Sequence, residues 1–500
     1  MDTRRLRTSI RIGCAAWIFL FVMLISPVAA GQQDASIIGQ VTDESGAVLP
    51  GVTVTATSPA LQVPSVVAVT NERGEYRLTP LPIGTYTVEY TLAGFQGTRH
   101  EGLRLTVGFT ASVDVRLKVG SLAETITVSG ASPVVDLTST TASTQFTRET
   151  IELIPSSRNG IVSLLAQAPG VRTLRDVGGS SINQVPTFRV FGQAGEPFAT
   201  LEGVQTSSLQ ASGGQANYWD YTTIEEAQVN TIGNGAEVPS RGVNLNAVVK
   251  SGGNDFHSTM WLNKTSSGLQ SKNIDADLAA RGVTNGPRLV TRESYSADLG
   301  GRIIRDKLWF YASARRALNG TEVINTYKPD GSPAVADDVA WFQTGKFNYQ
   351  MTTSNRFVGF YQYNHKHDVS SLDQNRTWIY RGGLMTPGST RKIEWQKIFG
   401  SALVTSLQYG FWIYNGLRFS YSPLDVPLST DVTTLENKGP TTDIGQQPHN
   451  PRHHYKGTMT WFKPDLFQGN HEFKFGFDYT DSWFGRQYPN REILSPDERY

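Results

Sequence analysis

Cysteine and charge are both scarce in this sequence. Cys14 is the single cysteine among 500 residues, and charged residues make up only 18%. One cysteine excludes an internal disulfide, so a large core or closed β pairing must hold the fold. The net charge of +1 excludes the basic footprint typical of nucleic-acid binding, and the mean hydropathy of −0.29 argues against a series of membrane-spanning helices. Glycine (48 residues) and aromatic residues (10%) are plentiful, as in a turn-rich β protein.

The first 30 residues have the pattern of an export signal. A start with four arginines precedes an apolar stretch and the small residues Val28 and Ala30. Small residues at this spacing mark a cleavage site, here after Ala30. The apolar run is short of the roughly 20 residues that a stable membrane span needs, which disfavours an uncleaved anchor. We therefore expect residues 1–30 to be a signal peptide that takes Cys14 with it.

Residues 35–119 hold many turn signals between short β-prone runs. The segments DESGAVLPG, TNERGEY and LPIGTY carry the Gly, Pro, Asn and Asp residues that separate antiparallel strands. Tyr86, Val88 and Tyr90 alternate with polar residues, which predicts a half-buried strand. The pattern predicts a small β-sandwich. Its turn set resembles the carboxypeptidase regulatory-like domain, a prealbumin-like sandwich with a carbohydrate-binding-like fold.

The next part of the chain resembles a plug domain. Residues 120–147 are rich in Ser and Thr, which predicts an extended linker. Between residues 148 and 255 the motifs APGV, LEGVQ, IEEAQV and VVKSGGNDFHS follow in an order similar to the plug of TonB-dependent outer-membrane receptors, with Glu202 standing for the family's aspartate. The resemblance implies structural roles for Pro169, Gly170, Val171, Leu201, Gly203, Val204, Glu225, Glu226, Lys250, Ser251 and Gly252.

Residues 256–500 consist of long alternating segments. In EFKFGFDYT, Phe473, Phe475, Phe477 and Tyr479 share one face of a strand. About nine such segments, joined by short turns and long polar loops, follow the pattern of outer-membrane strands. Plugged transporters have about 22 strands. We therefore expect an incomplete transmembrane β-barrel and the N-terminal part of a longer protein, with a degenerate gene or an assembly of chains as alternatives.

The expected fold is therefore mostly β: a sandwich, an α+β plug and an antiparallel barrel. The order of sandwich, linker, plug and barrel strands narrows the resemblance to the Oar-like receptors. In these receptors a short segment near the start of the plug, called the TonB box, pairs with the protein TonB of the inner membrane. β-branched residues favour such strand addition, and the resemblance places the box at Glu124, Thr125, Ile126, Thr127 and Val128. Without the resemblance, the run ETITVSG is more simply interpreted as the last strand of the sandwich or as part of a featureless linker.

The resemblance also implies a location and an activity. We expect the outer membrane of a Gram-negative-type bacterium, with the N-terminal domain in the periplasm and contact with lipid but not with nucleic acid. The expected activity is energy-coupled uptake of an unidentified extracellular solute. The alternative is a structural or adhesive surface protein that binds a glycan or polymer without import.

Catalytic patterns are absent from the sequence. It has no GxxxxGK[ST] loop, GxSxG elbow or HExxH motif, and its eight histidines are scattered. We interpret His453 and His454 as surface or girdle residues, and Asp337–Asp338 as capping residues ahead of a strand. The sequence therefore predicts neither enzyme activity nor a metal or other cofactor.

Overall fold

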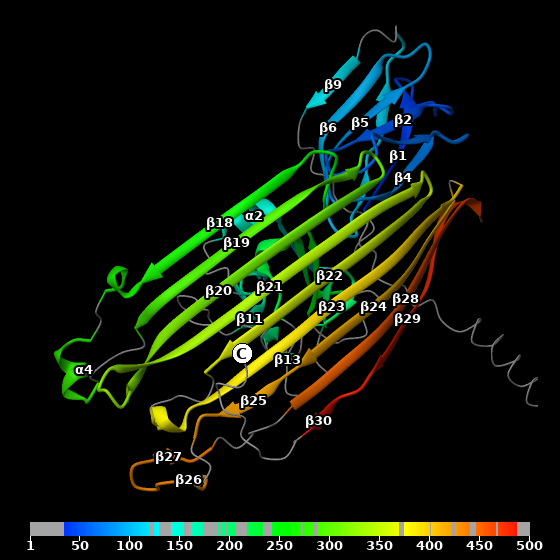
Figure 1. The fold of residues 1–500 in the computed structure, drawn as a ribbon. Coiled ribbons are helices and arrows are strands. Elements are labelled where there is room, and N and C mark those ends of the chain that lie inside the picture. The colour runs from blue at the N-terminus through cyan, green and yellow to red at the C-terminus, as the bar shows by residue number, and fades with distance from the viewer. Residues whose placement is uncertain are drawn as a thin grey trace, which may run out of the picture.

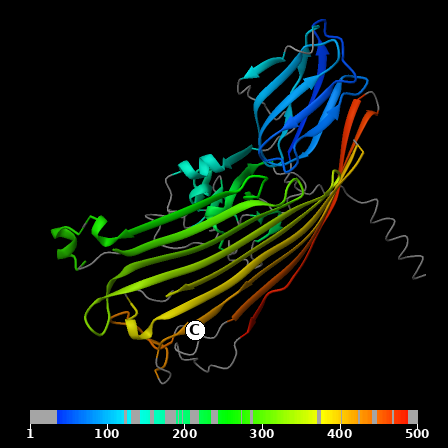
Figure 2. The same cartoon turned by 45° about the horizontal axis from the view of Figure 1, so that its top comes forward.

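The structure is a computed structural model in which a wide sheet carries a sandwich at one rim and a plug domain against one face (Figures 1 and 2). It describes residues 35–120, 125–129, 142–154, 160, 162–173, 188–190, 193–195, 198–206, 218–233, 243–271, 274–283, 288–369, 375–400, 402–422, 426–440, 447–466 and 469–487. The expected signal peptide, its cleavage site at Ala30, and Glu124 lie outside these ranges. Within them, no helix is long and apolar enough to cross a membrane.

The N-terminal sandwich packs two sheets face to face. In one sheet, β1 (Ala35–Asp43) pairs with β4 (Glu75–Leu81), β7 (Thr110–Ser112) and β8 (Val115–Leu117). The other has the order β3 (Val66–Val69), β2 (Thr53–Thr57), β5 (Gly84–Thr91), β6 (Gly97–Leu105) and β9 (Thr125–Ser129). Tyr86, Val88 and Tyr90 are fully buried between the sheets, which confirms the predicted alternation.

The plug domain is built on a five-stranded sheet. Its order is β10 (Ala142–Thr147), β16 (Ile224–Ile232), β17 (Asn244–Val249), β14 (Phe198–Leu201) and β15 (Val204–Gln205). Around it lie α2 (Arg148–Leu153), α3 (Val162–Leu165), η1 (Tyr221–Thr223) and a small sheet of β11 (Val171–Thr173), β12 (Phe188–Val190) and β13 (Gln193–Gly195). The buried plug core includes Tyr311 and Phe360 of the large sheet, so the two parts share one core. The expected linker thus begins and ends with strands, β9 in the sandwich and β10 in the plug.

In the described part of the chain, nine long antiparallel strands form the large sheet. They are β18 (His257–Ser266), β19 (Leu289–Ile304), β20 (Leu308–Tyr327), β21 (Pro333–Thr352), β22 (Asn355–Asp368), β23 (Gly382–Phe399), β24 (Leu403–Asn415), β28 (Gln447–Leu466) and β29 (Gly469–Ser482), paired in this order. The short β25 (Leu417–Ser420) and β30 (Gly485–Gln487) join its margin. The connections contain η2 (Ser267–Leu269), α4 (Ala276–Ala280), η3 (Trp378–Tyr380), β26 (Ser429–Thr430) and β27 (Asn437–Lys438). Over the described residues the sheet is not closed.

Side chains alternate across this sheet as the sequence predicts. On β29, Phe475, Phe477 and Tyr479 are exposed on the outer face. On β23, Lys392 and Glu394 are buried on the inner face, which lies against the plug. An apolar outer wall with a polar interior is the arrangement of a transmembrane barrel.

One expectation about this sheet is wrong. Asp337 and Asp338 lie inside β21 instead of preceding a strand. The Oδ1 atom of Asp338 is 3.3 Å from Nζ of Lys366 on the neighbouring strand. Asp338 therefore forms a cross-strand ion pair and does not cap a turn, because β21 begins earlier than its polar residues suggest.

The sandwich contacts both the rim of the large sheet and the plug. Arg77 of β4 lies 2.5 Å from a carboxylate oxygen of Glu472, and its guanidinium stands 5.6 Å from the ring centre of Phe462. The backbone N–H of Val107 donates to Glu226 of the plug at 2.7 Å. The turns 305–307 and 353–354 on the same rim of the sheet are short, and short turns mark the periplasmic rim of outer-membrane barrels.

Candidate functional site at the plug–barrel interface

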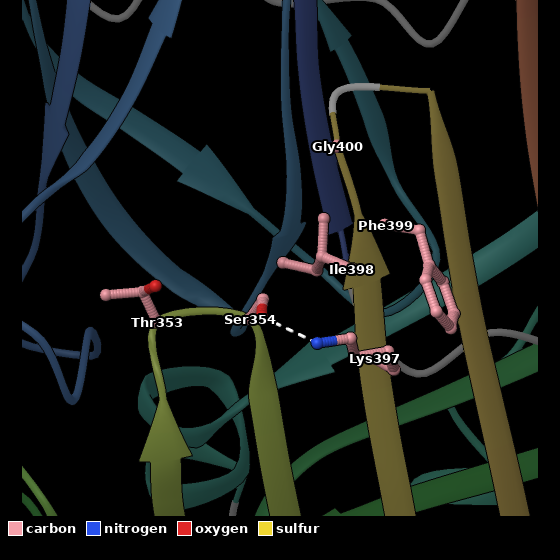
Figure 3. A pocket seen from close by; sticks show the side chains of 6 residues that line it. All are labelled: Thr353, Ser354, Lys397, Ile398, Phe399 and Gly400. Carbon is pink, nitrogen blue, oxygen red and sulfur yellow. Dashed lines mark hydrogen bonds between the residues drawn. The ribbon is translucent and has the colours of Figure 1, made fainter.

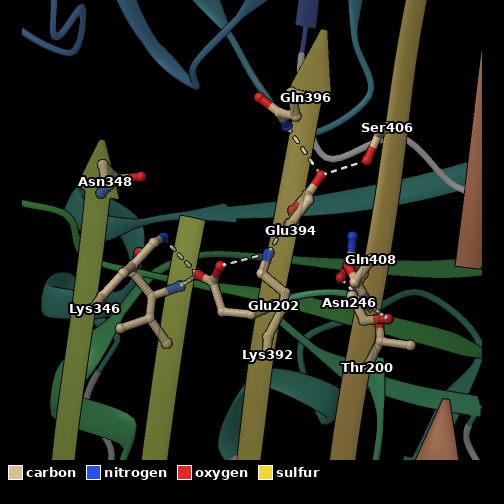
Figure 4. Close-up of polar contacts among 12 residues, drawn as sticks. Thr200, Glu202, Asn246, Lys346, Asn348, Lys392, Glu394, Gln396, Ser406 and Gln408 are labelled. Carbon is tan, nitrogen blue, oxygen red and sulfur yellow. Dashed lines mark hydrogen bonds and ion pairs between the residues drawn. The ribbon is translucent and has the colours of Figure 1, made fainter. Parts of the chain in front are cut away.

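Glu202 projects from the plug into the wall of the large sheet. It lies in the tight turn between β14 and β15, where its φ is 54° and that of Gly203 is 76°. One carboxylate oxygen accepts from Nζ of Lys346 at 2.7 Å, and the other accepts from Nζ of Lys392 at 3.3 Å (Figure 4). The first oxygen also accepts from the N–H of Val249 at 2.7 Å. The carboxylate is 2% exposed, so its partners replace water completely.

The two lysines extend this contact along the wall. Nζ of Lys392 also donates to Glu394 at 2.9 Å, and Nζ of Lys346 donates to the carbonyl of Val249 at 2.9 Å. Ser406 and Gln396 donate to the other oxygen of Glu394. Two carboxylates and two ammonium groups therefore balance within one buried cluster. Such balance is needed because an unpaired buried charge is very costly.

Two further ion pairs join the plug to the wall. Asp220 accepts from Arg315 of β20 at 3.3 Å, and both side chains are at most 1% exposed. Asp220 also accepts from the N–H of Thr222 at 3.2 Å, which caps η1. Nζ of Lys250 donates to Asp298 of β19 at 2.9 Å. We call these pairs and the Glu202 cluster the plug interlock.

The turn beyond Glu202 adds polar contacts to β24 and β28. Nε2 of Gln408 donates to the carbonyl of Gly203 at 3.2 Å. The N–H of Gln205 donates to Nδ1 of His454 at 3.4 Å, and Nε2 of His454 lies 2.7 Å from Asp478. An acceptor at Nδ1 places the proton on Nε2, which donates to the carboxylate. Because His454 is only 1% exposed, its interpretation as a surface or girdle residue is wrong.

The charge state of the interlock follows from its partners. Burial alone would raise the pKa of Glu202, but the ammonium groups of Lys346 and Lys392 hold that pKa below its usual value. Glu202 is therefore ionised at neutral pH. Glu226, at the contact between the plug and the sandwich, behaves differently. Burial raises its pKa to about 7, although the hydrogen bond from Val107 acts to lower that pKa.

The structure places the eleven plug-motif residues at different depths. Val171, Leu201 and Val204 are buried in the plug core or against the wall, and Pro169 and Gly170 precede β11. Glu225 pairs loosely with Arg148 at 4.0 Å. Four motif residues contact the sandwich or the large sheet: Gly203, Glu226, Lys250 and Gly252. Ser251 lies between Lys250 and Gly252 in the sequence.

Gly252 shows why this motif needs glycine. A Cβ atom at this position would stand 2.0 Å from the carbonyl oxygen of Phe310 and 2.8 Å from that of Gly301. Both atoms belong to the backbone of the wall and cannot move aside as a side chain can. The motif therefore lets the end of the plug approach the large sheet closely.

Apart from Lys250, which belongs to the plug motif, the charged residues that hold the plug were not found from the sequence. Glu202 attracted attention only as a departure from the family pattern, and the lysines on β21 and β23 gave no local signal. Their partners lie 144 and 190 positions away along the chain. A pattern search could have flagged them only as charges on the inward face of strands whose outer face is apolar.

A separate open groove lies at the rim, between the β21–β22 and β23–β24 turns (Figure 3). It has a volume of about 560 Å³ and is lined by Thr353, Ser354, Lys397, Ile398, Phe399 and Gly400. Nζ of Lys397 donates to Oγ of Ser354 at 2.9 Å. Its lining contains no residue of the interlock.

Comparison with known proteins supports this architecture. Residues 36–118 match the carboxypeptidase regulatory-like domain. Over 380 residues the chain is 30% identical to the TonB-dependent transporter Oar of Myxococcus xanthus, an alignment that covers 71% of this chain and 34% of Oar. By sequence, the chain resembles the Oar-like TonB-dependent receptors. It spans about a third of the length of Oar.

Solved structures show the same fold at low sequence identity. The outer-membrane transporter YddB of Escherichia coli is 14% identical, with a TM-score of 0.52 over 68% of this chain and 48% of YddB. FpvA of P. aeruginosa, solved bound to heterologous pyoverdines, is 10% identical, with a TM-score of 0.50 over 69% of this chain and 42% of FpvA. At this level of identity the likeness shows a shared fold.

Proposed function

We propose that this Oar-like chain forms the plug-bearing part of a receptor that imports a solute across the outer membrane with energy from TonB. The plug interlock is the observation that carries the proposal. It joins the plug to the wall by buried ion pairs, all of which must separate before the plug can leave the wall. The interlock is therefore the structure that TonB must open before a solute can pass.

The N-terminal sandwich is proposed to lie in the periplasm. It contacts the same rim that carries the short turns, through Arg77 and Glu472. The candidate box at residues 124–128 lies largely in β9, the last strand of the sandwich, so TonB would reach it from the inner membrane. The solute binds on the opposite side, at the long connections, and a glycan is one candidate for it. The comparisons lend no support to the adhesive alternative.

The experiment compares solutes removed from the medium by four strains. They carry the full-length receptor, no receptor, a receptor lacking Glu124–Val128, or the full-length receptor without TonB. Mass spectrometry of the spent medium should reveal a solute whose depletion requires receptor, box and TonB together. Depletion that persists without the box and without TonB would refute coupled uptake. Surface binding that requires the receptor, with no depletion of any solute in any of the four strains, would favour the adhesive alternative.

A further inference from the structure

The candidate TonB box is already part of a β-sheet. Residues Thr125–Ser129 form β9, which pairs in parallel with β6 from Gly97↔Thr125 to Glu101↔Ser129. Four of the five box residues lie in this strand. Their main chain is therefore extended before any partner arrives, and one edge of the strand has its ladder partner.

The other edge of β9 is open over the described part of the chain. β9 is the last strand in the order β3-β2-β5-β6-β9, and Figures 1 and 2 show it at the outer margin of the sandwich. An edge strand presents unpaired N–H and C=O groups that act as a template for another strand. The sandwich thus displays the box in the conformation that strand addition requires.

We propose that TonB adds a strand to the outer edge of β9 while β9 stays paired with β6. The inference rests on the proposed role of the box as the segment that TonB recognises. TonB then becomes the next strand of the sandwich sheet. The interaction surface is the outer edge of β9, and its partner is an edge strand of TonB's periplasmic domain.

The rival arrangement is strand exchange, in which TonB removes the box from β6. Exchange must first break five residue pairs along β6 and leaves the edge of β6 unpaired. Addition forms new main-chain bonds without breaking any. It also acts on a strand whose backbone is already ordered, so less conformational entropy is lost on binding. These considerations favour addition.

A disulfide between β6 and β9 separates the two arrangements. Arg99 and Thr127 are directly opposite in the register, and both side chains are exposed. Neighbouring strands lie about 4.8 Å apart, within the range of Cα separations that a disulfide spans. Within residues 1–500 the only natural cysteine is Cys14, in the expected signal peptide, and any cysteine further along the full-length receptor is first replaced by serine. The full-length double variant Arg99→Cys/Thr127→Cys, purified in detergent, is titrated with the periplasmic domain of TonB, oxidised and then reduced.

We expect the Kd for TonB to differ by less than about threefold between the oxidised and reduced forms. A loss of binding by about a hundredfold on oxidation, restored by reduction, would show strand exchange and overturn the inference. The single variants Arg99→Cys and Thr127→Cys are the matched controls. Arg99 contributes only an exposed pair with Glu101, which is worth little to stability.

Deletion of Glu124–Val128 tests the underlying role separately. If the deletion leaves TonB binding unchanged, the box lies elsewhere and the inference fails together with that part of the proposed function. If the deletion abolishes binding but the oxidised variant also loses it, only the inference fails.

Hydrogen exchange on the unaltered receptor gives a second measurement that does not depend on disulfide formation. With TonB bound, amides of β9 should gain protection while those of β6 keep theirs. A loss of protection along β6 would refute addition.

Discussion

Replacing Glu202 by Gln should loosen the plug. The substitution keeps the shape of the side chain but leaves Lys346 and Lys392 with only Glu394 to balance two buried positive charges. All four side chains are at most 11% exposed, so water cannot compensate. The cluster then carries a net charge of +1 inside the protein.

The size of the effect follows from this burial. Removing one partner of a buried ion pair costs about 3–5 kcal/mol, which corresponds to a change of about 150- to 5,000-fold in the equilibrium between a seated and a displaced plug. With a denaturant slope of about 1–3 kcal/mol per molar urea, the midpoint for plug release should fall by at least about 1 M.

The assay is the conductance of the full-length receptor in planar lipid bilayers at increasing urea concentration. Glu225→Gln is the matched control, because Glu225 is on the same plug but is 37% exposed and stands 4.0 Å from its partner. That control should change stability by less than about 1 kcal/mol. Adding Lys346→Met to Glu202→Gln removes the excess charge and should recover most of the loss. If Glu202→Gln behaves like Glu225→Gln, the interlock does not hold the plug.

Three other predictions concern the remaining contacts of the plug and the wall. Burial raises the pKa of Glu226 to about 7 in the folded state, so the folded state binds the proton more tightly than the unfolded state. The free energy of unfolding should therefore fall as the pH rises from about 4.5 to 7. Urea titrations should show that Glu226→Gln flattens this dependence. Gly252→Ala should displace the plug end from Phe310, measured as increased protease cleavage there, whereas an unchanged digest would contradict the close approach. Ile393→Lys, on the exposed outer face of β23, should cost about 2–4 kcal/mol of barrel stability in lipid, while Ile393→Leu should cost almost nothing; equal urea midpoints would place this face away from lipid.

Most of the fold was predictable because its signals are local. The alternation of Phe473 to Tyr479 follows from the period of a strand, and it holds wherever the strand lies. The turns of the sandwich, Gly252 and the order of plug motifs are also short-range features. The mistaken turn at Asp337–Asp338 also comes from a local signal. Two adjacent acidic residues suggest a turn, and only the fold shows that Lys366 on the neighbouring strand pairs with Asp338.

The sequence by itself determined which segments are strands, which face of each is apolar, and that the chain carries a sandwich, a plug and barrel strands. Only the tertiary structure decided that Glu202 meets Lys346 and Lys392, that His454 faces the plug, and that β9 completes a sheet of the sandwich. The physical reason is that alternation depends on neighbours two residues away, whereas an ion pair or an added strand depends on which distant segments the fold brings within a few ångströms.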